Sequence, residues 1–98
     1  MRVLGKQFLV EFKQKYIDAI DQVDYWIDCM ENTTFKNSHD VKNKYASASF
    51  LAKNVVIFNL KGNKYRIEVK IAYNASIIEV IWLGSHNEYD KRNKILRR

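Results

Sequence analysis

The chain has 98 residues, of which 47% are hydrophobic, with a formal net charge of +6 and one cysteine. This length suits one folded unit, so we expect residues 1–98 to form a single domain. No apolar run is long enough to cross a bilayer, and the N-terminal segment lacks the features of a signal peptide. Because Cys29 has no cysteine to pair with, the composition favours a protein of the reducing cytoplasm.

The positive charge is concentrated in the second half of the chain. Residues 1–59 carry a net charge of +1, whereas residues 60–98 carry +5. A concentrated basic surface attracts polyanions such as nucleic acids, although the same excess also occurs in basic proteins that bind none. The charge alone therefore leaves nucleic-acid binding open.

The first third of the chain predicts a short strand and two helices. Residues 1–4 suit an edge strand, and the apolar residues between positions 6 and 16 form one helical stripe. Asp18 is expected to cap a second helix of about fifteen residues. The aspartates of that helix lack the compact loop geometry of a calcium site, so we interpret them as a solvated face and predict no metal site.

The middle of the chain predicts a short helix followed by a strand-rich region. Ser38 is a candidate cap for a helix over residues 40–45, and residues 46–50 read as a loop. Residues 54–60 favour a strand, followed by a tight turn over residues 61–63 in which Gly62 and Asn63 are able to take positive φ.

Residues 64–73 alternate strictly between apolar and charged side chains, which is typical of a half-buried strand. Residues 77–83 form the next strand of the predicted meander. We therefore expect an α+β fold, with the N-terminal helices packed on one face of an antiparallel sheet. The opposite face stays open and carries Arg66, with His86 and Tyr89 at its rim.

Two segments of the second half carry a family resemblance. They are "IFNLKGNKYR" (57–66) and "GSHNEYDK" (84–91), and the segments "MRVLGKQFLVEF" and "DVKNKY" match more loosely. Together they resemble the HigB-type toxins of bacterial type II toxin–antitoxin systems, within the RelE-like group. The family often has a proline between its first two helices, where this chain has "KYIDAID", which leaves that helix boundary open.

The resemblance implies a RelE-like, microbial-ribonuclease-like fold and a ribosome-dependent mRNA endonuclease that inhibits translation. The implied partners are mRNA in the ribosomal A site, the ribosome itself and a cognate helix-turn-helix antitoxin of the HigA type. It implies no cofactor and no membrane. From the residues alone, a non-catalytic RNA- or ribosome-binding module and a domain that binds an acidic protein remain alternatives.

Cleavage through the 2′-hydroxyl of RNA requires orientation, proton transfer and stabilisation of an anionic phosphorus, and these steps need no metal. His86 is the candidate acid or base, because a general acid or base works best with a pKa near the ambient pH, and this favours histidine as a residue type. Arg66 is the candidate phosphate ligand. Tyr89 either stacks on a base, binds the phosphate or donates a proton. The alternatives are a strand-end histidine, an arginine paired with Glu68 or Glu79, and an aromatic packed on the sheet.

A second group of polar residues is expected to bind RNA rather than to react with it. It comprises Lys64, Lys91, Asn63 and Arg92, with Asn59 as a weaker candidate. Asp90 and Glu88 are expected to orient a neighbouring cation or His86, and His39 is expected to be solvent-exposed. The basic C-terminal segment from Lys91 onward either grips RNA electrostatically or frays in solution.

Overall fold

The computed structural model describes the backbone of residues 1–96 and the side chains of residues 1–92. Ten elements follow one another along the chain. They are β1 (Arg2–Leu4), α1 (Lys6–Lys15), the 3₁₀ turn η1 (Ile17–Ala19), α2 (Ile20–Glu31), α3 (Ser38–Lys44), β2 (Ser49–Phe50), β3 (Val55–Leu60), β4 (Tyr65–Ala72), β5 (Ile77–Ser85) and α4 (His86–Leu96). Within this described part, no helix combines the length and apolar character needed to cross a membrane.

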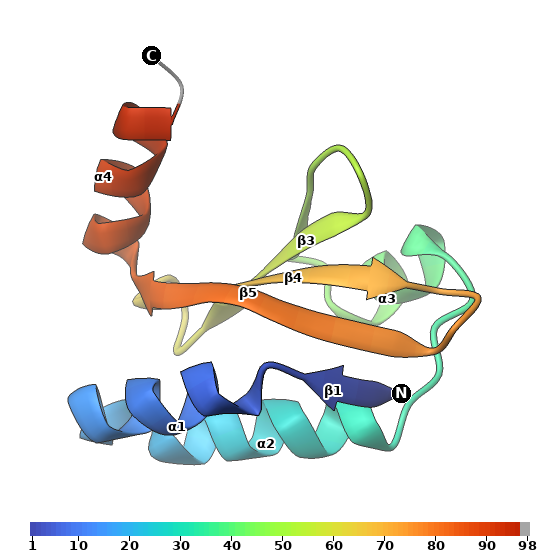
Figure 1. Ribbon diagram of the computed structural model, residues 1–98, viewed down its shortest axis with the longest axis horizontal. Coiled ribbons are helices and arrows are strands. Elements are labelled where there is room, and N and C mark those ends of the chain that lie inside the picture. Colours follow the sequence, from blue (N-terminus) through green and yellow to red (C-terminus); the bar gives the residue numbers. More distant parts are fainter. Residues whose placement is uncertain (97–98) are drawn as a thin grey trace.

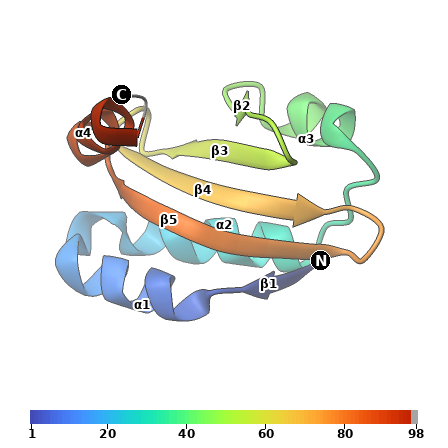
Figure 2. The same cartoon turned by 45° about the horizontal axis from the view of Figure 1, so that its top comes forward.

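The strands form one mixed sheet in the order β1-β5-β4-β3-β2. β1 lies at the edge of the sheet, as expected of residues 1–4, but it pairs with β5 in parallel. The other pairs are antiparallel, so the sheet is mixed and not wholly antiparallel as predicted. In Figure 1 and Figure 2, α1 and α2 lie side by side against one face of the sheet, whereas α4 projects from the end of β5 on the other side. The predicted α+β class, with N-terminal helices on one sheet face, is confirmed.

The core lies between the first two helices and the sheet. The predicted inward set of residues 64–73 is Tyr65, Ile67, Val69, Ile71 and Tyr73. The first four are buried on β4, and Tyr73, just after the strand, is partly buried against the same core. The helices contribute Leu9, Phe12, Val23, Trp26 and Met30, and each of them is almost fully buried. Burial of apolar area on this scale is the main force that holds helices and sheet together.

Two predicted helix caps were wrong. Asp18 lies inside the 3₁₀ turn, and Ala19 precedes α2 without a side-chain cap. The Asp18 carboxylate instead accepts hydrogen bonds from Lys64 and Tyr65 at the start of β4, and this long-range pairing replaces the local cap. Asn37 rather than Ser38 caps α3, because its side chain accepts a hydrogen bond of 3.0 Å from the Asp40 N–H.

The loop and the turn also differ from their predictions. Ser49 and Phe50, expected in a loop, pair with β3 as the edge strand β2. In the turn before β4, positive φ occurs at Lys61 and Gly62 and not at Asn63. β5 extends two residues beyond its predicted end, and the segment from Lys91 to Leu96, expected to be a tail, belongs to α4. The last two residues of that predicted tail, Arg97 and Arg98, lie outside the described residues.

Candidate functional site

The candidate site lies where β5 ends and α4 begins. Ser85 and Glu88 form a reciprocal cap: the Glu88 N–H donates to Ser85 Oγ at 3.2 Å, and the Ser85 N–H donates to Glu88 Oε1 at 3.0 Å. This capping box starts a helix directly after the strand. His86, Tyr89 and Arg92 then follow at intervals of three residues, so they share one face of α4.

Arg66 and Tyr89 are in direct contact at this corner. Arg66 lies on β4, opposite Gly84 of β5, and its guanidinium carbon is 4.7 Å from the centre of the Tyr89 ring. Tyr89 is 6% exposed, and a cation over an aromatic face is an attractive arrangement. The Arg66 Nε is buried and finds no hydrogen-bond partner among the described residues. No ion pair joins Arg66 to Glu68 or Glu79, the two glutamates that the sequence offered as partners, and Glu68 pairs with Arg92 instead.

His86 lies at the same corner and is more exposed. Its backbone N–H donates to the Lys64 carbonyl at 2.9 Å, which ties the first turn of α4 to the start of β4. Its ring Nε2 is 3.0 Å from Asp90 Oδ2, one turn further along the helix, and the His86 side chain is 41% exposed. The three predicted catalytic residues thus share one corner, with Arg66 and Tyr89 touching and His86 one helical turn before Tyr89.

The sequence predicted that Lys64 lies on the polar strand face together with Arg66. In the structure Lys64 precedes β4, and its side chain reaches Asp18 instead. Its ammonium lies 2.6 Å from Asp18 Oδ2, and this hydrogen bond raises the pKa of Lys64. The same contact, followed by the hydroxyl of Tyr65, holds the pKa of Asp18 well below its usual range. The charge expected to bind phosphate is thus paired with Asp18 at the protein surface, and Asn63 is exposed in the turn.

Arg92 also has a partner within the protein. Its two terminal nitrogens lie 2.8 and 3.4 Å from the two carboxylate oxygens of Glu68. Lys91, its neighbour, is exposed on α4. His39 is exposed in α3, at the opposite end of the sheet from α4 (Figure 1).

Comparison with family models identifies the family of the segment that forms this corner. Residues 19–92 match the model of the HigB toxin family, which is described as the RelE-like toxic component of a toxin–antitoxin system. The chain belongs to this family. The comparison with curated proteins gave no match. The family predicted from the two sequence motifs is therefore confirmed, and membership implies an antitoxin partner.

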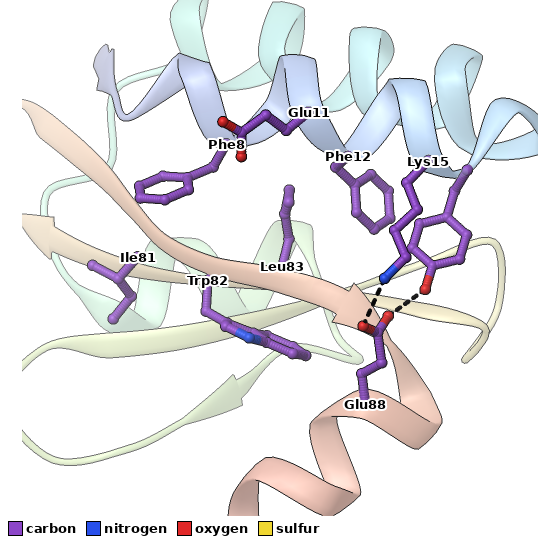
Figure 3. A pocket seen from close by; sticks show the side chains of 9 residues that line it. Phe8, Glu11, Phe12, Lys15, Ile81, Trp82, Leu83 and Glu88 are labelled. Atoms are coloured by element: carbon purple, nitrogen blue, oxygen red, sulfur yellow. Dashed lines mark hydrogen bonds and ion pairs between the residues drawn. The ribbon is translucent and has the colours of Figure 1, made fainter.

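The matched segment of this HigB-type toxin runs from the end of the 3₁₀ turn to Arg92, so it contains the whole corner. A groove of about 210 Å³ borders the corner on the side of α1. Figure 3 shows its apolar walls from α1 and β5, with Glu88 at one end. Glu88 accepts hydrogen bonds there from Lys15, at 3.1 Å, and from the hydroxyl of Tyr16. Glu88 therefore joins α1, β5 and α4.

Sequence reasoning gave Glu88 an orienting role without identifying its partners. The pattern "SHNE" is the signature of a capping box, and this local signal identifies Ser85 as the start of a helix. The contact with Tyr16, 72 residues earlier in the chain, has no such local signal.

Glu88 makes the toxin's stability depend on pH in the acid range. The Tyr16 hydroxyl, followed by the Ser85 N–H, lowers the pKa of Glu88 from 4.5 to about 2. A carboxyl whose pKa is lower in the folded state stabilises the fold above its unfolded pKa, and this contribution disappears as the pH falls through the folded pKa. We expect Glu88→Gln to lower the melting temperature above pH 4.5, with a difference from wild type that shrinks toward pH 2.

The matched control for this measurement is Glu79→Gln, because Glu79 is exposed on β5. Thermal melts by circular dichroism across the acid range should show little difference between this control and wild type. A Glu88→Gln difference that stays constant with pH would show that the ionised carboxylate is not the stabilising form.

Proposed function

We propose that this toxin is an endoribonuclease that cleaves mRNA in translating ribosomes by attack of a ribose 2′-hydroxyl on the adjacent phosphate. The observation that supports this most directly is the Arg66–Tyr89 contact at the corner where His86 is exposed. A fixed cation next to a group that can transfer protons is the minimum that this reaction needs, since RNA supplies its own nucleophile.

Arg66 is proposed to bind the scissile phosphate. Its guanidinium keeps its charge at any working pH and can bind two phosphate oxygens at once. The Tyr89 ring, packed between Arg66 and Trp82, holds that guanidinium in place. Because these two neighbours occupy the ring, we assign Tyr89 to orienting Arg66 rather than to stacking on a base.

His86 is proposed to transfer the proton. An imidazole is well suited to this role near neutral pH. Asp90, 3.0 Å from Nε2, favours a proton on that nitrogen and leaves Nδ1 as the free acceptor. His86 would then remove the proton of the 2′-hydroxyl through Nδ1 or, once doubly protonated, donate one to the leaving 5′-oxygen.

The partners follow from the same proposal. The ribosome presents mRNA in its A site, and a cognate helix-turn-helix antitoxin blocks the corner until it is removed. Residues 1–98 act as one toxin domain in this scheme. Among the cations expected to bind RNA, Lys91 is the one that the structure leaves exposed on α4, whereas Lys64 and Arg92 are paired.

Induced expression in a bacterial host, with mapping of mRNA 5′ ends, tests this proposal. Wild type should arrest growth and create new ends within translated frames. His86→Ala should reduce cleavage by about 10²–10⁴-fold, the range typical for loss of a general acid or base. His39→Ala is the matched control, because it removes the other histidine at the far end of the sheet, and it should remain toxic.

Two outcomes would count against the nuclease. Growth arrest without new ends would indicate the alternative, a module that binds RNA or the ribosome without cleaving it. Full cleavage by a folded His86→Ala protein would remove His86 from the mechanism.

A further inference from the structure

A second contact between α4 and the sheet lies beyond the proposed catalytic residues. It joins Glu68 of β4 to Arg92 of α4 through two hydrogen bonds, of 2.8 and 3.4 Å. Glu68 is 6% exposed and is the one charged residue that is buried in the described part of the chain. The sequence predicted it on an open, solvated face, so its burial is a consequence of the docking of α4.

Trp82 of β5 connects this pair to the proposed site. The Arg92 guanidinium lies 5.2 Å from the Trp82 ring centre, and the Trp82 and Tyr89 rings are 5.8 Å apart. The indole lies so close over Gly84 that a Cβ at that position would be 2.9 Å from two of its ring carbons. A continuous series of contacts therefore runs from Glu68 through Arg92, Trp82 and Tyr89 to Arg66.

A buried carboxylate is unfavourable unless it is paired, and removing its partner leaves a buried charge. A bidentate arginine–carboxylate contact also fixes the orientation of the arginine side chain, because the planar guanidinium has to face the carboxylate. Arg92 is thereby held at one point on the sheet. Since Arg92, Tyr89 and His86 share one face of α4, this anchor sets how the helix is rotated on the sheet.

The other end of the helix is anchored independently. The Ser85–Glu88 cap holds the first turn, but a helix held at one end can still swing about that point. Tyr89 lies between the two anchors. The Glu68–Arg92 pair attaches α4 to the sheet on the far side of Tyr89 from the cap.

We propose that Glu68 and Arg92 are positioning residues of the nuclease, which hold α4 so that Tyr89 covers Arg66 and His86 faces the same phosphate. This rests on the proposed function. It assigns Arg92 to a contact within the protein, whereas the sequence suggested that Arg92 binds RNA. Arg92 and Glu68 act on the reaction only through α4.

The test compares Arg92→Met and Glu68→Gln with the control Lys70→Met, which removes an exposed cation of β4 at the end of the strand far from α4. Two measurements are made on each purified protein. The first is an NMR spectrum of the two indole N–H groups, in which Trp82 reports on α4 and the core residue Trp26 reports on the fold. The second is kcat and KM for cleavage on ribosomes programmed with a short synthetic mRNA.

Both positioning variants should shift the Trp82 signal and leave that of Trp26 in place. They should lower kcat by about 10- to 100-fold, the scale of a misplaced catalytic group, with KM changed by less than about twofold. Lys70→Met should leave kcat and the Trp82 signal unchanged. Glu68→Gln preserves side-chain volume, so it decides the matter if Arg92→Met does not fold.

Two results would overturn the proposal. A raised KM with unchanged kcat in Arg92→Met would make Arg92 a contact to RNA, and an unmoved Trp82 signal in both variants would show that the pair does not hold α4. If wild type cleaves nothing, the nuclease assignment fails, while the indole spectra still decide whether the pair anchors the helix.

Discussion

Replacing Arg66 with alanine is expected to lower mRNA cleavage by about 10²–10³-fold, the usual effect of removing one donor from a developing oxyanion, and to abolish growth arrest. The reason is geometric. Arg66 is held on the central strand β4 and against Tyr89, so no neighbouring cation can take its place without moving the sheet. The measurement is single-turnover cleavage of a synthetic mRNA on ribosomes, together with a growth assay.

Two further variants make this experiment specific. Arg66→Lys keeps the charge but loses the planar fork, so it should retain only a small part of the activity. Lys70→Ala removes a cation from the same face of the same strand, but at the end far from α4, where Lys70 pairs with Glu79 in the strand register. It should cleave like wild type. An Arg66→Ala protein that loses its sheet signal by circular dichroism would mean that Arg66 is structural.

The strand that carries Arg66 could be predicted because its pattern is local. Alternation with a period of two determines which side chains of β4 face the core, and the structure has these residues buried as expected. The helical stripe of α1 was only partly informative. Leu9 and Phe12 are buried, but Phe8 is 41% exposed and borders the groove beside β5. Hydrophobic spacing identifies the apolar face of a helix, but it does not show how much of that face the sheet covers.

The partners of the charged residues could not be predicted, because they depend on contacts between distant segments. Asp18 and Lys64 are 46 residues apart, and Arg92 and Glu68 are 24 apart. An aspartate just before a helix is a good cap. Asp18 binds Lys64 instead because the fold brings the start of β4 next to it. The sequence thus identified the cations near the site but not which of them the protein itself neutralises.

These pairings change how the basic half of the chain is interpreted. With Lys64 and Arg92 both paired, the positive charge of this region acts partly to hold α4 and the β3–β4 turn in place. Among the described residues at the corner, the guanidinium of Arg66, the exposed imidazole of His86 and the exposed ammonium of Lys91 remain without an acidic partner other than Asp90, which contacts His86. A site with few available charges suits catalysis that depends on orienting the RNA more than tight binding of RNA through many charges.

Gly5→Ala is expected to cost about 3 kcal/mol of folding free energy, a large effect for one methyl group. Gly5 has a φ of +84° where β1 turns into α1, and a Cβ there would lie 2.7 Å from the Val80 carbonyl oxygen of β5. Because that oxygen belongs to the backbone of β5, the clash can be relieved only by moving β1 and the start of α1 away from β5. Urea denaturation followed by circular dichroism measures the loss.

The control for this prediction is Gly62→Ala. Gly62 also has a positive φ, of +69°, but its Cβ would point into open space, so only the backbone penalty of about 1 kcal/mol applies. The difference between the two variants therefore isolates the close approach of Gly5 to β5. Equal losses would show that the close approach contributes nothing. A larger loss at Gly5 would show that a residue without a Cβ is needed there for α1 to lie against β5, the strand that leads to the candidate site.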